Sequence, residues 1–326
     1  MNPRMLRTLA FIAAALFVVS SVSSAQTPNA DVSFYVRVAD VEAASFLTSV
    51  AVRRESNLVV GPALHGIRLN IDRSYSSTNE LFEDIAKRVD GVVVQRGEVT
   101  VVKGKCIAGG GGSIEKDRGA QKVSLNFQHI EVPTLLAVLR DFLSNNFKGD
   151  SKVARAPTAN LGVAVRDVPI ASLLDAIAMA SGSDLIRGSS GDIAVNARQP
   201  AGDCLPRASQ FAARSNVQSF APRLENTQPA GAPLRRVEKL EGYALQSLVA
   251  RGFMDSPSGR TGFVESPDDL LFTVLKGNYV GRQFGRIDRI SDEGIALREI
   301  VQDDHGVWRE SENSLAFVPV KSTAER

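Results

Sequence analysis

The sequence predicts a multidomain α+β protein, with two small repeated αβ modules followed by a small all-β sandwich or barrel. Residues 32–104 and 123–198 show the same order of strand and helix patterns. After residue 240, short β-type runs alternate with glycine-containing turns, which is typical of a small β domain. Residues 105–122, rich in glycine, and residues 199–237, rich in Pro, Ala, Ser and Arg, lack apolar periodicity. Both are predicted to be linkers, the second of them disordered.

Residues 1–25 have the pattern of a cleaved export signal. Arg4 and Arg7 precede an uncharged apolar stretch, and small residues stand before a cleavage point between Ala25 and Gln26. The apolar stretch is shorter than the roughly 20 residues that span a bilayer. We therefore expect a mature protein exported to the periplasm. An uncleaved inner-membrane anchor is the alternative.

The first module, residues 26–104, opens with alternating apolar residues at 32–36, the period of a half-buried strand. A helix is expected over residues 44–51, because its apolar side chains fall on one helical face. Ser77 and Glu80 have capping-box spacing, so a second helix should begin there. Short strands should close the module.

The second module, residues 123–198, repeats this order. A strand is expected at 123–127, and Pro133 suits the first turn of the helix that follows. A second helix should begin near Pro169 and end near Gly182. A repeat of this length indicates a duplicated small domain rather than a solenoid, which uses shorter periods and more copies.

Two short motifs of the second module carry a family resemblance: Leu125-Asn126-Phe127 and Asp167-Val168-Pro169. On these residues it resembles the secretin and TonB short N-terminal domain, and it is similar to the ring-forming N-domains of secretins. The first module keeps only the pattern of this domain. The resemblance implies that both modules are protein–protein recognition units.

The two cysteines, Cys106 and Cys204, each follow the last predicted strand of a module. An exported chain is chemically allowed to form a disulfide, so we predict a bridge between them. Two free thiols are the alternative. Their spacing does not fit a zinc site or a CxxC redox motif.

The C-terminal domain, residues 238–326, is predicted to be built from short strands. We expect them at residues 263–265, 270–275, 285–290, 295–301 and 307–310. Gly277-Asn278 is a favourable tight-turn pair, where positive φ costs no Cβ clash. Gly281 and Gly285 complete this set of structural turn residues. Trp308, the single tryptophan, is expected in the core.

A particular order of motifs runs through residues 240–317. It begins Leu240-Glu241-Gly242-Tyr243-Ala244-Leu245, passes through the glycine-rich run 276–287, and ends Gly306-Val307-Trp308-Arg309-Glu310. This order resembles the PilP family, periplasmic assembly proteins of the type IV pilus. The resemblance implies a non-enzymatic assembly factor that binds the outer-membrane secretin and inner-membrane pilus assembly proteins. PilP proteins usually carry an N-terminal lipid, whereas no cysteine follows the apolar stretch here.

The domain is also similar to the homology region of the type II secretion protein GspC. A type II secretion coupling protein is therefore one alternative. A TonB-linked or peptidoglycan-associated signalling component, built on the two N-terminal modules, is another.

The chemistry-bearing residues form no recognisable motif. His65, His129 and His305 lack metal-binding spacing, and His129 is expected to be solvated. The net charge of +2 gives no reason to expect nucleic acid. We expect no enzyme, no catalytic residue, no metal, no cofactor and no small-molecule substrate.

Overall fold

The computed structural model describes residues 32–105, 107, 122–142, 159–187, 193–197, 235–303 and 305–320. The predicted signal with Ala25 and Gln26, most of both linkers, and Cys106 and Cys204 lie outside these residues. Within the described part the chain is mixed α+β, mostly sheet with four α-helices, as predicted, and its C-terminal part is rich in β-structure. No helix there is long and apolar enough to cross a bilayer.

The first segment, residues 34–104, alternates strands with two helices. Its elements are β1 (Phe34–Glu42), α1 (Ala43–Arg53), β2 (Leu58–Val60), the 3₁₀ turn η2 (Pro62–Leu64), β3 (Arg68–Tyr75), α2 (Thr78–Arg88), β4 (Gly91–Arg96) and β5 (Val99–Gly104). The Glu42 carboxylate caps α1 by accepting the Ser45 N–H at 2.6 Å. Ser77 caps α2 by accepting the Glu80 N–H at 3.2 Å, which places this helix start where the sequence predicts it.

The second segment, residues 122–197, contains the other two helices. Its elements are β6 (Lys122–Glu131), α3 (Val132–Phe142), β7 (Asn160–Pro169), α4 (Ile170–Ser181), β8 (Ser183–Arg187) and β9 (Ile193–Ala197). Pro169 stands at the N-cap of α4, and Gly182 ends it at φ +67°. Left-handed backbone of this kind favours glycine because a Cβ would strain it.

The C-terminal segment, residues 235–320, is built from 3₁₀ turns and strands. Its elements are η3 (Lys239–Gly242), η4 (Leu245–Ser247), β10 (Val249–Ser256), β11 (Gly259–Glu265), β12 (Leu271–Val274), β13 (Tyr279–Val280), β14 (Gly285–Ile290), β15 (Gly294–Gln302) and β16 (Trp308–Ala316). The strand pattern predicted β12, β14 and β15, and it predicted β11 and β16 in part. The sequence left residues 240–251 open between a short helix and a strand, and the long strand β10 includes only the last three of them.

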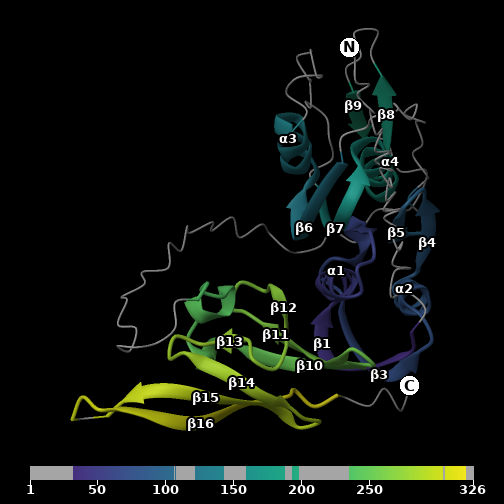
Figure 1. Cartoon of the computed structure of the whole chain (residues 1–326). Helices are drawn as coiled ribbons and strands as arrows, with labels where there is room; N and C mark the ends of the chain where they lie inside the picture. Colours follow the sequence, from purple (N-terminus) through teal and green to yellow (C-terminus); the bar gives the residue numbers. More distant parts are fainter. Residues whose placement is uncertain are drawn as a thin grey trace, which may run out of the picture.

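The three segments share sheets instead of standing apart (Figure 1). One five-stranded sheet has the order β12-β11-β10-β1-β3, so it joins the C-terminal segment to the first segment. Its seam is the antiparallel pairing of β1 with β10, from Tyr35 opposite Asp255 to Val38 opposite Gly252. A second sheet, β4-β5-β2-β7-β6, joins the first and second segments. The strands β13-β14-β15-β16 form a separate sheet.

The first and second segments have a similar order of elements, yet each gives strands to one common sheet through the β2–β7 pairing. Although residues 105–122 are predicted to be a linker between two modules, the described strands of the two modules form one common sheet. The duplication itself, and its likeness to secretin N-domains, stay predictions.

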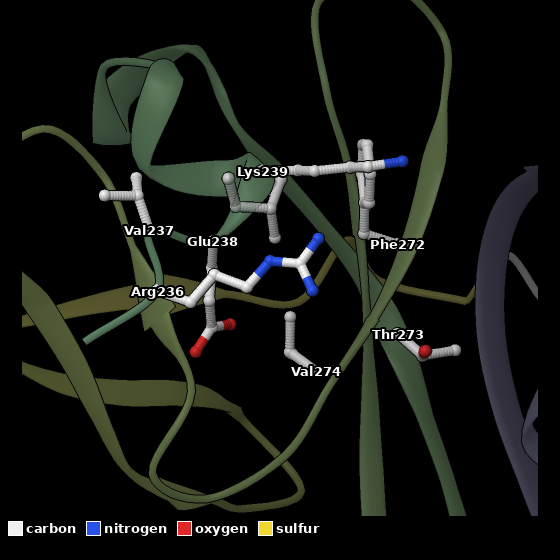
Figure 2. Close-up of a pocket in the computed structure, with 8 residues that line it drawn as sticks. Arg236, Val237, Glu238, Lys239, Phe272, Thr273 and Val274 are labelled. Carbon is white, nitrogen blue, oxygen red and sulfur yellow. The ribbon is translucent and has the colours of Figure 1, made fainter. Parts of the chain in front are cut away.

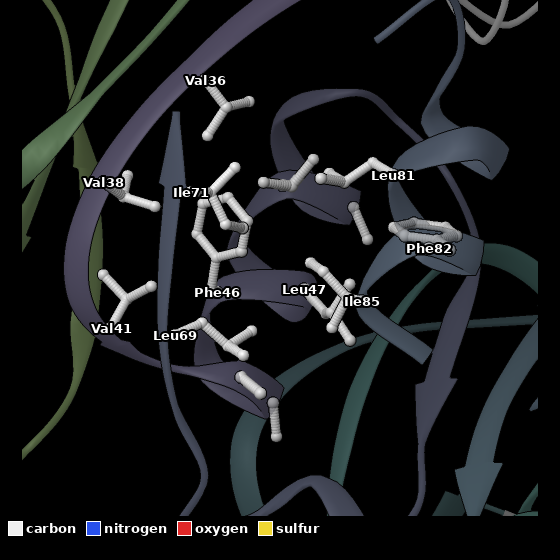
Figure 3. Close-up of a cluster of buried hydrophobic side chains, with 14 of the residues drawn as sticks. Val36, Val38, Val41, Phe46, Leu47, Leu69, Ile71, Leu81, Phe82 and Ile85 are labelled. Atoms are coloured by element: carbon white, nitrogen blue, oxygen red, sulfur yellow. The ribbon is translucent and has the colours of Figure 1, made fainter. Parts of the chain in front are cut away.

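Helix α1 is the centre of the largest core (Figure 3). Phe46 and Leu47 on α1 pack among side chains of β1, β3 and α2. The same cluster includes Met254, Phe263 and Leu271 of the C-terminal segment. The rings of Phe46 and Phe263 meet edge to face with centroids 5.2 Å apart. The core thus crosses the seam between the first and C-terminal segments.

We expect Phe46→Ala to destabilise the whole chain. Phe46 is fully buried, so its loss removes apolar contacts and leaves a cavity, at a cost of about 3–5 kcal/mol. Urea unfolding of the full chain measures this change. Val52→Ala, on the same helix but 43% exposed, is the matched control and should change stability by less than about 0.5 kcal/mol. An equal effect of the two variants would contradict the packing described here.

Candidate functional site at the junction of the segments

Gln128 on β6 connects the second segment to the edge of the β10–β12 sheet. Its side-chain oxygen accepts the Leu271 N–H at 2.8 Å, and its amide nitrogen donates to the Leu271 carbonyl. Ser49 on α1 donates to that same carbonyl at 3.0 Å. The amide thus offers β12 the donor and acceptor that a neighbouring strand would offer. The backbone groups of Leu271 at the β12 edge are therefore hydrogen-bonded within the molecule and do not offer a strand edge to another protein.

An ion-pair network holds the seam of the same sheet. Glu265 on β11 accepts from Arg68 at 2.9 Å and from both Nε and Nη2 of Arg251 at 3.0 Å. Arg251 also donates to the Asp40 carboxylate at 2.9 Å, which ties β10 to β1. Burial by itself raises the pKa of Glu265, but hydrogen bonds and charges from Arg68 and Arg251 outweigh it and lower the pKa. Glu265 is therefore held as a carboxylate at neutral pH.

Two histidines and a glutamate meet near the start of α1. His65 Nδ1 lies 3.0 Å from His129 Nδ1 and 3.6 Å from Glu42 Oε1. The other nitrogen of His129, Nε2, lies 2.9 Å from the Ser45 hydroxyl. His129 is exposed, as predicted, yet both of its ring nitrogens have protein partners. Burial, and then the nearby His129, lower the pKa of His65 to about 3, so this ring is neutral at physiological pH.

The sequence did not indicate this grouping. Glu42 ends β1, His65 follows η2, and His129 lies on β6, so no local spacing connects the three. A local indication in the sequence is that Glu42 stands just before the helix, where its carboxylate can cap α1. The cap holds this carboxylate in one orientation.

The predicted turn of the C-terminal segment lies between β12 and β13. Gly277 has φ +92°, where side chains are strained, and its N–H donates to the Ile287 carbonyl at 2.8 Å. The Asn278 side chain accepts the Leu275 N–H at 2.7 Å. Gly281 lies at φ +76°, whereas Gly285 is needed for space, because a Cβ there would lie 2.5 Å from the Val280 carbonyl oxygen.

The expectation that Trp308 is a core residue is wrong. Its side chain is 39% exposed at the start of β16, and the neighbouring Val307 is exposed too. The physical reason is position: β16 is the outer strand of its sheet, and nearly all of its side chains are exposed. Within the described residues, β16 pairs only with β15.

A surface pocket of about 480 Å³ lies between the chain entering η3 and the strand β12 (Figure 2). Its lining is Arg236, Val237, Glu238, Lys239, Leu240, Phe272, Thr273 and Val274. Glu238 in this lining also accepts a hydrogen bond from the Asn278 side chain at 3.3 Å. Glu238 thus connects the pocket lining to the turn described above, and the pocket belongs to the C-terminal segment.

Comparison with known proteins connects the C-terminal segment to pilus assembly. Residues 206–317 match the family model described as pilus assembly protein, PilP. The resemblance read from residues 240–317 is thereby confirmed for this part of the chain. No protein among those with curated descriptions matches the chain.

Solved structures of the same kind are also similar. A domain of the type IV pilus biogenesis lipoprotein PilP from Pseudomonas aeruginosa is 30% identical, with 26% of this chain and 94% of that one covered and a TM-score of 0.24. The solution structure of PilP from Pseudomonas aeruginosa is 25% identical, with 30% and 86% covered and a TM-score of 0.25. A domain of the Neisseria meningitidis PilP pilot protein is 30% identical, with 30% and 84% covered and a TM-score of 0.24.

We expect Gly277→Val to lower the stability of the protein by about 1–3 kcal/mol, because a β-branched residue is forced to positive φ. A Cβ added at this position meets no atom within 4 Å, so backbone strain is the expected cause. Thermal unfolding of the full chain measures the change. Gly242→Val is the control, since its Cβ also meets nothing and its φ is not positive. Equal melting temperatures for Gly277→Val and the wild type would contradict this view of the turn.

The Glu265 network should make stability depend on pH. A carboxyl whose pKa is lowered by folding stabilises the fold above its ordinary pKa of 4.5, and this contribution is lost as pH falls through the folded-state pKa. We expect the unfolding free energy to fall between about pH 5 and about pH 3, and to fall less steeply in Glu265→Gln. Denaturant unfolding across this range measures it.

The control for that experiment is Glu310→Gln, which removes an exposed ion pair with Arg298. Exposed pairs contribute little, so this variant should keep the wild-type pH profile. A Glu265→Gln profile parallel to the wild type would show that other groups cause the acid sensitivity.

Proposed function

We propose that the protein is a non-enzymatic assembly factor of the type IV pilus, located in the periplasm, which binds the outer-membrane secretin and links it to the inner-membrane assembly proteins. The observation that carries this proposal is the match of residues 206–317 to the PilP family model. The sequence order of its motifs supports the same function.

The sheet β13–β16 is the surface we assign to the secretin. Within the matched segment, the other sheet is used internally, since β10 pairs with β1 and the β12 edge receives the Gln128 amide. The outer strand β16 keeps an edge without a partner in the described residues, with Trp308 exposed beside it. Exposed strand edges accept strands of other proteins, and tryptophan often anchors interfaces.

The first and second segments supply additional recognition surfaces in this proposal. They correspond to the modules at residues 26–104 and 123–198, with the C-terminal domain at residues 238–326. We assign the contacts to the inner-membrane proteins to these two segments, because the β13–β16 sheet is assigned to the secretin. The bridge between Cys106 and Cys204 is part of the same proposal and would hold the ends of the two segments together.

Trp308→Ala in the full-length exported protein tests the assigned surface. We expect co-purification of the secretin to weaken by about tenfold or more, and twitching motility and surface pilin to fall with it. The melting temperature should stay near the wild type, because Trp308 packs into no core cluster of the described residues. Val52→Ala, another exposed apolar residue far from this sheet, is the control and should bind normally.

The assigned surface and the pilus function can fail independently, and a different result excludes each. Normal secretin binding by Trp308→Ala would exclude this residue and direct attention to the rest of the sheet. Normal piliation after deletion of the whole gene would exclude the pilus function itself.

A further inference from the structure

We propose that Glu42, His65 and His129 form a binding site for a divalent transition-metal ion, with Zn²⁺ as the best-fitting ion. This site is independent of the pilus function proposed above. It joins the start of α1 in the first segment to strand β6 in the second.

The donor atoms already lie close to the separation that a metal requires. One ligand atom from each of the three residues lies within 4.8 Å of the others. His65 Nδ1 is 3.0 Å from His129 Nδ1 and 3.6 Å from Glu42 Oε1. Four ligands at about 2.0–2.1 Å from a tetrahedral Zn²⁺ lie about 3.3–3.4 Å apart, so an ion fits with small shifts.

The carboxylate is fixed by the backbone. The Ser45 N–H donates to Oε2 of Glu42 at 2.6 Å, and the Gly66 N–H donates to Oε1 at 3.0 Å. Glu42 is 6% exposed, so it has little freedom to turn away. Each carboxylate oxygen has a second lone pair, and therefore Oε1 keeps one for a metal.

The Nδ1 atoms of the two histidine rings face each other, and Nδ1 of His65 also lies beside the Glu42 carboxylate. When Nε2 of His129 donates to the Ser45 hydroxyl, its Nδ1 carries the lone pair that a metal needs. His65 is 8% exposed, and its Nε2 has no hydrogen-bond partner in the described residues. In the absence of an ion, the contact of 3.0 Å between the two Nδ1 atoms places the proton of His65 on Nδ1, so metal binding there moves this proton to Nε2.

The ligand set also selects the kind of ion. Two imidazole nitrogens and one carboxylate oxygen suit Zn²⁺ and its neighbours and are a poor set for Ca²⁺ or Mg²⁺, which prefer oxygen ligands. His129 is exposed, so an ion can enter from solvent and complete its coordination with water. A bound ion would fasten β6 to α1 next to Gln128, the residue that contacts the C-terminal segment.

Zinc binding to the full mature chain, free of any affinity tag, tests the proposal. The protein is stripped with a chelator, its thiols are alkylated, and ZnCl₂ is added in a calorimeter. We expect one equivalent to bind and the melting temperature to rise by at least about 5 °C at saturating Zn²⁺. Co²⁺ should give the absorption of a tetrahedral nitrogen and oxygen site.

The three histidines of the chain provide a matched control. His129→Ala and His129→Gln change an exposed residue of the site, and both should bind Zn²⁺ at least about tenfold more weakly. His305→Ala removes an exposed histidine of the C-terminal segment and should bind as the wild type does. Wild-type protein that binds no Zn²⁺, or His129 variants that bind it equally well, would overturn the proposal.

Discussion

The antiparallel pairing of β1 with β10 is the interaction on which the remaining architecture depends. It places residues 35–38 beside residues 252–255 and so makes one sheet from strands far apart in the chain. Gly252 permits the approach, because a Cβ there would lie 2.0 Å from the Arg37 carbonyl oxygen. Once this sheet exists, α1 can pack on it, and the core around Phe46 receives side chains from both ends of the sequence. The ion pairs of the Glu265 network, such as Arg68 with Glu265 and Arg251 with Asp40, stabilise the same seam.

This seam gives the two sheets of the matched C-terminal segment different contacts. The β10–β12 sheet is bound to the first segment, and its β12 edge meets Gln128 of the second. The β13–β16 sheet is free of these contacts and carries the exposed Trp308. The segment that resembles PilP is thus attached to the N-terminal segments through the β10–β12 sheet, and not through the β13–β16 sheet.

Local features could be predicted from the sequence, and features that depend on distant pairing could not. The cap at Ser77, the helix end at Gly182 and the turn at Gly277 each follow from the chemistry of neighbouring residues. The sequence left residues 240–251 open between a short helix and a strand, because Arg251 and Gly252 interrupt the alternation of β10 and its pairing with β1 spans more than 200 positions. Trp308 was misplaced for a related reason: composition favours burying a tryptophan, but only the topology shows that its strand is the outer one. The grouping of His65 with His129 depends on how β6 meets α1, which no motif encodes.

The same seam sets an order of events while the chain is being made. The protein emerges N-terminus first, whether from the ribosome or through a membrane translocon, so β1 appears long before β10 does. Until residues 249–256 follow, one edge of β1 is open and Phe46 lacks the ring of Phe263. Contacts this distant in sequence form slowly, and an unpaired strand edge can join a strand of another molecule in the meantime. The first segment therefore reaches its final packing only when almost the entire chain has been delivered, which makes a truncated copy more exposed to aggregation than a full-length one.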